Sequence, residues 1–109
     1  MDTWIDVCAV DELEPGDYRT LWIDDEEVAV IECNGQVHAI QDVCTHDGGE
    51  LTGGTIEGCE IECPRHGARF DIRTGAVLCP PAYEPIDIYP VEIRNGRIFV
   101  NSEPTGNSA

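Results

Sequence analysis

The chain has 109 residues, of which 41% are hydrophobic, and its 22 acidic residues against six arginines give a formal charge of -16. A chain of this length forms one domain with a modest core, and its longest aliphatic run, residues 28–31, is far too short to span a bilayer. These values exclude a membrane protein, a coiled coil and a multidomain enzyme, and the negative charge makes nucleic acid an unsuitable partner.

The first half of the chain contains four candidate strands. Residues 3–9 and 18–23 are candidate strands, and Pro15-Gly16-Asp17 is the expected turn between them. Residues 28–33 and 36–41 flank Asn34-Gly35, a dipeptide typical of the tight turn of a β-hairpin.

The second half contains shorter candidates and one strong hairpin signal. Residues 60–62 and 68–72 could each form a short strand. Asn95-Gly96 predicts a two-residue turn that places Ile93 opposite Ile98, so that one face of the ribbon is apolar.

Two loops and a tail complete the expected organisation. Glycines crowd residues 42–58, and prolines exclude residues 79–85 from the interior of a sheet. Residues 103–109 are expected to be a flexible tail. No helix is expected, and many short strands with regular turns predict an all-β sandwich or barrel.

The acidic composition has two interpretations that can coexist. It can serve solubility, including tolerance of a salty cytoplasm, or it can steer the protein towards a basic patch on a partner.

Six cysteines and three histidines could mean disulfides or a metal. The amino terminus carries no secretory signal, which favours a reducing cytoplasm, where clustered cysteine and histidine more often bind metal. Two short loops hold the main cluster: Cys44-Thr45-His46 and Cys63-Pro64-Arg65-His66-Gly67. Each loop offers one thiolate and one imidazole, a mixture that allows two irons to sort the sulfur and nitrogen ligands between them.

This pattern of C-x-H, sixteen residues and C-P-x-H-G resembles the Rieske [2Fe-2S] motif. The continuation His66-Gly67-Ala68-Arg69-Phe70-Asp71 is similar to the small Rieske ferredoxins that serve aromatic-ring-hydroxylating dioxygenases. The resemblance implies the Rieske fold of stacked antiparallel sheets in one domain over residues 1–102. It also implies a small cluster-binding subdomain at about residues 42–84, and the stretch around Pro80-Pro81, within residues 79–85, resembles the family's proline loop that covers the cluster.

The same resemblance implies one [2Fe-2S] cluster, with both thiolates on the inner iron and both imidazoles on the outer one. The implied ligands are Cys44, Cys63, His46 and His66.

The function implied is one-electron transport from an NAD(P)H-dependent flavin reductase to a terminal non-haem iron oxygenase. No second iron site is evident in the chain, so it should not be an enzyme itself. It is expected to be a cytoplasmic monomer without a membrane partner. Its role in aromatic hydrocarbon catabolism is implied by the family alone.

The resemblance also indicates a low-potential cluster. High-potential relatives have an extra disulfide between the ligand loops, and hydroxyls that donate to the cluster sulfurs. This chain has Gly49 and Arg65 at the former positions and Ala68 and Phe70 at the latter. Hydrogen bonds to sulfur favour the reduced state, so their absence predicts a potential of roughly -150 mV.

The alternative to an electron carrier is a structural zinc site in an interaction module, because two thiolates and two imidazoles can also hold one zinc ion. An all-thiolate cluster would need Cys59 and Cys79 as well, and their spacing does not match the plant-type ferredoxin pattern.

The remaining candidates have simpler interpretations. Four cysteines are expected to be small buried or half-buried hydrophobic residues: Cys8, Cys33, Cys59 and Cys79. His38 is expected to be an ordinary strand residue. Arg65, Arg69 and Arg73 either neutralise nearby carboxylates such as Asp71 or form a positive rim for docking.

Overall fold

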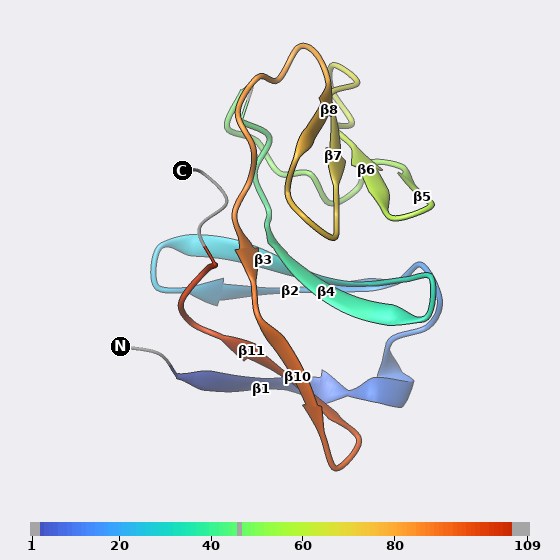
Figure 1. The fold of residues 1–109 in the computed structure, drawn as a ribbon, viewed down its shortest axis with the longest axis vertical. Coiled ribbons are helices and arrows are strands. Elements are labelled where there is room, and N and C mark those ends of the chain that lie inside the picture. Colours follow the sequence, from blue (N-terminus) through green and yellow to red (C-terminus); the bar gives the residue numbers. More distant parts are fainter. Residues whose placement is uncertain (1–2, 46, 106–109) are drawn as a thin grey trace.

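The structure, a computed structural model, describes residues 3–45 and 47–105. Three antiparallel sheets are stacked along the long axis of the molecule (Figure 1). Sheet A has the order β1 (Trp4–Ala9), β11 (Arg97–Asn101) and β10 (Val91–Arg94). Sheet B has the order β2 (Tyr18–Ile23), β3 (Glu26–Cys33), β4 (Gln36–Gln41) and β9 (Ile88–Tyr89). Sheet C has the order β5 (Ile56–Glu57), β6 (Glu60–Glu62), β7 (Arg69–Asp71) and β8 (Val77–Cys79).

Sheet B is the central layer, and two hydrophobic cores lie on its two sides. Alternate residues of β3 point to opposite faces, as the two-residue period of a strand requires. Val28 and Val30 belong to one core with Ile98 of sheet A, whereas Ala29 and Ile31 belong to the other core. All residues 28–31 are completely buried, which explains the continuous aliphatic run in the sequence.

The second core joins sheet B to sheet C and to the loops around it. Its completely buried members include Leu51, Ile61, Phe70 and Ile86. Sheet C consists of strands of only two or three residues, so it depends on this packing for its position.

The structure confirms both expected hairpins. Asn34 and Asn95 have positive φ angles of 51°, each followed by a glycine that is also positive, as a type I′ turn requires. Ile93 lies opposite Ile98, as the turn predicts.

Several small elements were not individually expected, although short strands within residues 42–58 were left open. The strands β5, β8 and β9 are two or three residues long, and residues Val10–Glu12 form a 3-10 helix after β1. Within the described residues, this one turn is the only helix, and none is long and apolar enough to cross a membrane.

The cysteines outside the two loops differ from expectation in one respect. Cys8, Cys33 and Cys59 are buried and Cys79 is half-buried, as expected. However, Cys33 and Cys59 form a disulfide with a Cα–Cα distance of 5.3 Å. The interpretation of all four as simple hydrophobic residues was therefore wrong for this pair, because the end of β3 and the turn between β5 and β6, 26 residues apart in the sequence, meet in the fold.

His38 lies in β4, as expected, opposite Ile31. Its Nε2 is buried without a hydrogen-bond partner in the described part of the chain, and burial lowers the pKa of its imidazole.

Part of the expected flexible tail is held in place. The Thr105 amide donates to the Ile88 carbonyl at 2.8 Å, and the Glu103 amide donates to the Asn101 side chain. Residues 106–109 lie outside the described residues.

Candidate metal centre

Two loops at the end of the molecule farthest from sheet A carry the candidate ligands (Figure 1). The first loop follows β4, and the second joins β6 to β7. Each begins with a cysteine whose amide and carbonyl are both bonded across the loop. Cys44 N–H donates to Gly49 O and its carbonyl accepts from Gly48, both at 2.7 Å. Cys63 N–H donates to Ala68 O at 2.7 Å and its carbonyl accepts from Gly67.

These bonds bring the two thiols together in the interior. Cys44 is 0% exposed and Cys63 is 1% exposed. Their Sγ atoms and a carboxylate oxygen of Asp47 all lie within 4.8 Å of one another. Two cysteines that are far apart in the sequence thus bring their sulfur atoms together in the buried interior, as binding to one shared inorganic centre requires.

The surroundings of Cys63 favour its thiolate. Burial alone would raise the pKa of this thiol, but the amides of Arg65 and His66 and the thiol of Cys44 donate hydrogen bonds to its sulfur. The net pKa is lowered. A metal-binding cysteine needs this form, because the thiolate is the ligand.

The histidine of the second loop lies at the surface. The His66 side chain is 54% exposed, and its Nδ1 is 3.7 Å from Asp47 Oδ2. His46 lies outside the described residues. The described part of the site therefore has sulfur inside and imidazole outside.

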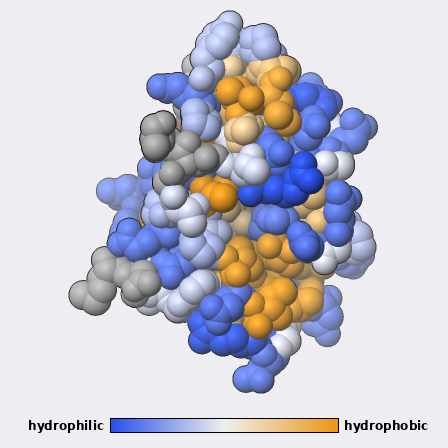
Figure 2. Space-filling model, in the orientation of Figure 1, coloured by the Kyte–Doolittle hydropathy of each residue, from blue (hydrophilic) through white to orange (hydrophobic). Residues whose placement is uncertain are grey.

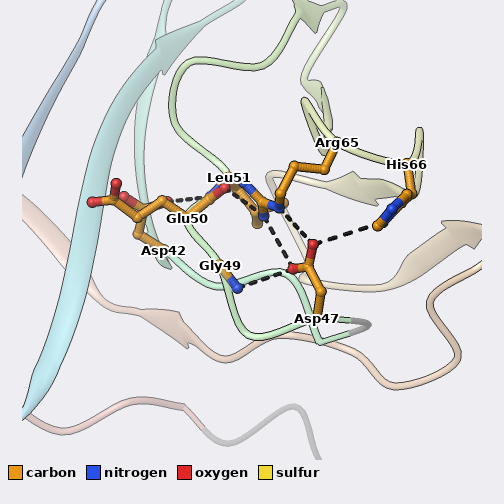
Figure 3. Close-up of polar contacts among 7 residues, drawn as sticks. All are labelled: Asp42, Asp47, Gly49, Glu50, Leu51, Arg65 and His66. Carbon is orange, nitrogen blue, oxygen red and sulfur yellow. Dashed lines mark hydrogen bonds and ion pairs between the residues drawn. The ribbon is translucent and has the colours of Figure 1, made fainter.

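An ion pair joins the two loops (Figure 3). Arg65 Nε donates to Asp47 Oδ2, and Arg65 Nη2 donates to Asp47 Oδ1 at 3.1 Å and to the Glu50 carbonyl at 2.9 Å. The guanidinium, together with the Gly49 amide, holds the pKa of the Asp47 carboxyl far below its usual range. A fixed charge pair thus spans the two loops.

The proline loop is bonded to both ligand loops. Thr45 Oγ1 donates to the Glu84 carbonyl at 2.6 Å, and the Cys79 thiol donates to the Gly67 carbonyl at 3.3 Å. The Pro80-Pro81 peptide bond is cis. The two hydrogen bonds from Thr45 and Cys79 hold the proline loop against one side of the site.

Of the two interpretations of the arginines, the structure shows neutralisation. Arg69 bonds to Glu60 at 3.0 Å and to Glu62 at 2.9 Å, and Arg73 bonds to Asp71 at 3.2 Å. Because Arg65 is paired as well, the three cations form no net positive rim.

Two residues relevant to redox tuning are completely buried. Ala68 and Phe70 are both 0% exposed, and neither carries a hydroxyl. The residues present fit an iron-sulfur cluster: two adjacent buried thiols, hydrogen bonds that stabilise thiolate, and an exposed imidazole.

The role of Asp47 was not foreseen. Its only sequence signal is its position beside the first motif.

The fold and this donor set define a class, and comparison with known proteins agrees. Residues 3–90 match the Rieske [2Fe-2S] domain, and the chain belongs to this family. It therefore carries one Rieske-type [2Fe-2S] cluster, and the zinc alternative finds no support.

The individual relatives are ferredoxins. The chain is 39% identical over 100 residues to the ferredoxin component of the naphthalene 1,2-dioxygenase/salicylate 5-hydroxylase systems of Ralstonia sp., covering 92% of this chain and 96% of the relative. The ferredoxin of carbazole 1,9a-dioxygenase from Nocardioides aromaticivorans IC177 superposes with a TM-score of 0.84 at 36% identity, covering 90% of this chain and 96% of that one. A chain in a complex of reduced oxygenase and oxidised ferredoxin in carbazole 1,9a-dioxygenase has a TM-score of 0.89 at 34% identity, covering 94% and 95%. The chain is accordingly an electron carrier of the ferredoxin type and not itself an oxygenase.

Proposed function

We propose that the chain carries single electrons from a flavin-containing, NAD(P)H-dependent reductase to a terminal non-haem iron oxygenase. The proposed cluster ligands are Cys44 and Cys63 on the inner iron and His46 and His66 on the outer iron. The observation that carries this assignment is the pair of buried sulfur atoms, within 4.8 Å, supplied by two loops that also carry histidines.

When bound, the cluster supplies a one-electron couple between its oxidised and singly reduced forms. The chain's own residues hold and orient it. The amides after Cys63 stabilise the thiolate, and Phe70 and Leu51 exclude water from the core beside the loops. His66 lies at the surface, where an electron can pass to a partner over the shortest path.

The same end of the molecule suits docking to the oxygenase. A hollow of about 310 Å³ is lined by Thr45, Pro81, Tyr83 and Glu84, next to the first ligand loop. Tyr83 is 81% exposed, an unusual position for a large aromatic residue without a partner. Apolar side chains also gather around β8 on the face in Figure 2, and Leu78 of that strand is 45% exposed.

The relatives support the choice of partner. One solved structure, named as a complex of reduced oxygenase and oxidised ferredoxin, contains a chain of this fold. The names of several relatives place them in naphthalene and biphenyl dioxygenase systems. We infer the same class of system for this chain, with the reductase partner, the cytoplasmic location and the monomeric state inferred from the same relationship. We also assign the cluster-binding subdomain to about residues 42–84 of a single domain over residues 1–102.

Electron paramagnetic resonance of the purified, reduced protein tests the ligand assignment. We expect two irons per chain and the signal of a Rieske centre, with a low average g-value because two imidazoles bind one iron. His66→Cys, which leaves His46 as the one imidazole of the proposed ligand set, should shift this signal away from that of a Rieske centre or abolish it. An unchanged signal in that variant would contradict the assignment of His66.

Stopped-flow mixing of the reduced protein with an oxidised dioxygenase of the related systems tests the docking face. Tyr83→Ala should slow electron transfer at low protein concentration while leaving the potential unchanged. Trp22→Ala is the matched control, because Trp22 is also exposed, at 67%, but lies on β2 of sheet B. Equal slowing by both variants would place the docking face elsewhere.

A further inference from the structure

The Cys33–Cys59 disulfide has no part in the electron-transfer chemistry described above. It joins the end of β3 in sheet B to the turn between β5 and β6 in sheet C. The β3–β4 and β5–β6 turns meet at one side of the interface between sheets B and C, whereas the ligand loops lie at the outer end of sheet C (Figure 1).

The bond closes a covalent ring of the chain that includes the first ligand loop. Residues 34–58 lie inside this ring, and Cys44 is among them. On the other side of the bond, Cys59 precedes Cys63 by four residues, with only β6 between them. The Cys59 carbonyl also accepts from the Ile72 amide at 2.8 Å, which ties it to the segment after β7. Both ligand loops are therefore anchored to sheet B through this link.

Little else holds this side of the interface closed. In the described residues, no backbone hydrogen bond joins the Asn34-Gly35 turn to the Gly58-Cys59 turn. Apart from the disulfide, the contacts that the described part of the chain makes between sheets B and C there are those of buried side chains. Loss of the bond would thus free one edge of sheet C without breaking any ladder.

The position of Cys59 is conformationally costly. Gly58 and Cys59 have φ angles of 55° and 64°, so Cys59 occupies the left-handed region that favours glycine. The equivalent second position of the neighbouring turn is a glycine, Gly35. A cysteine at this position needs a compensating interaction, and the bond to Cys33 supplies one.

A groove lies directly beside the pair. A groove of about 470 Å³ is lined by both cysteines and by three glycines, and a Cβ built on any of these glycines would meet nothing within 4 Å: Gly16, Gly35 and Gly58. No side chain at these positions covers the bond. Cys33 is 5% exposed and Cys59 is 1% exposed, so a small thiol that enters the groove reaches their sulfur atoms only when this side of the interface opens.

We propose that Cys33 and Cys59 form a thiol–disulfide exchange site, whose oxidised state clamps the two sheets together and slows loss of the cluster. The co-reactant is a low-molecular-weight thiol or its disulfide. In the reducing direction, the thiolate of one such molecule attacks a sulfur of the pair, the S–S bond breaks, and the other cysteine leaves as a thiolate and takes a proton from water. A second thiol resolves the mixed disulfide. Two small thiols thus become one disulfide as two cysteine thiols form.

The exchange reaction does not require the cluster. The proposed slowing of cluster loss does, and that part rests on the proposed function. The first experiment is therefore alkylation of the holoprotein, purified without reductant, followed by peptide mass spectrometry. We expect Cys33 and Cys59 to be linked, and to become alkylated after treatment with 2-mercaptoethanol. Free thiols at both positions, even after incubation with an oxidised small disulfide, would overturn the proposal.

The second experiment measures cluster loss as bleaching of the visible absorbance in the presence of an iron chelator. Reduction of the bond should accelerate bleaching on the order of tenfold, because the ring no longer limits opening of the loops. Cys33→Ala should bleach at the fast rate with or without thiol, which separates this effect from direct attack on the cluster. Cys59→Gly, which also relieves the backbone, should be insensitive to thiol as well. Cys8→Ala, a buried cysteine outside the pair, should keep the wild-type response.

Equal bleaching rates for the oxidised and reduced wild-type protein would overturn the proposal that the disulfide slows cluster loss, even if mass spectrometry finds the bond. Absence of iron from the purified protein would instead contradict the proposed function, and the alkylation result would stand unaffected. The two failures are therefore distinguishable.

Discussion

The guanidinium of Arg65 occupies the space that a side chain at Gly49 would need. A Cβ at Gly49 would lie 2.6 Å from Arg65 Cζ and 2.7 Å from Nη2. By family resemblance, these are the two positions at which high-potential relatives place a disulfide. In this chain a glycine and an arginine in close contact, fixed by Asp47, replace that covalent link.

This contact predicts a specific non-additivity. Gly49→Ala should displace the guanidinium from Asp47, and the cluster should be lost severalfold faster. In an Arg65→Ala background the same substitution should have almost no effect, since the space is then empty. Bleaching rates of the four proteins in this cycle measure the coupling. Additive effects would show that the contact does not hold the loops.

A second glycine is required by a backbone approach. A Cβ at Gly54 would lie 1.8 Å from the carbonyl oxygen of Glu62, one residue before a proposed ligand. Gly54→Ala must therefore push apart two backbone segments, at a cost of about 2–3 kcal/mol. Thermal unfolding of the holoprotein should show a clearly lowered midpoint. Gly53→Ala is the control. It adds a Cβ in open space, so it should lower stability only through the strain of an alanine at a positive φ angle. If both variants unfold alike, the close approach is not the cause.

Removal of one sulfur ligand should abolish cluster assembly. Cys44→Ser or Cys63→Ser should yield colourless protein with little iron, and the two loops should lose stability because metal binding contributes folding free energy. Iron analysis and far-ultraviolet circular dichroism on the same samples separate these effects. Stoichiometric iron in either variant would show that the altered cysteine is not a ligand.

The midpoint potential should lie at the low end of the Rieske range, about -150 mV. Ala68 and Phe70 are buried beside the second ligand loop and bring no hydroxyl to it. A dye-mediated redox titration gives the value. Phe70→Tyr should raise the potential if its new hydroxyl donates towards the site, because such a bond favours the reduced state. A clearly positive potential in the wild-type protein would contradict this account.

Stability should depend on pH through a cluster of three carboxylates. Oxygens of Glu27, Asp42 and Glu50 lie within 4.8 Å of one another. A hydrogen bond with Glu50, then burial and the nearby Asp42 charge, raise the pKa of Glu27 to about 7. A carboxyl whose pKa is raised by folding stabilises the fold below its unfolded pKa, and that contribution is lost as the pH rises towards 7.

Glu27→Gln should therefore remove a fall in stability between about pH 4.5 and pH 7. Urea unfolding at several pH values measures it. Glu26→Gln is the control, because the neighbouring Glu26 is exposed and faces the other way. A steeper pH dependence in Glu27→Gln than in the wild-type protein would have the wrong sign for this explanation.

The sequence allowed the hairpins, the two ligand loops and the family to be predicted, because each depends on local signals. The Asn95-Gly96 turn sets the register of β10 and β11 without help from the rest of the fold. The motif spacing likewise carries the family resemblance, from which the ligand set is proposed. Short strands such as β5 and β9 escaped prediction because two residues carry no periodic pattern.

Long-range pairings could not be predicted in the same way. Six cysteines allow many pairings, and nothing near Cys33 identifies Cys59 as its partner. The Asp47–Arg65 pair crosses 18 residues, and the sequence offered other carboxylates for that arginine. Both contacts follow from the packing of sheet C on sheet B, which no single segment encodes.

The pairing of the arginines has a consequence for the solution behaviour of the protein. Five of the six arginines are already bonded to carboxylates of the same chain: Arg65, Arg69, Arg73, Arg94 and Arg97. Most of the acidic side chains are thus left to attract mobile sodium and potassium ions from the medium. A cationic surface that binds this protein must displace part of that ionic atmosphere. The entropy of the released ions then favours association in dilute buffer and fades as the ionic strength rises.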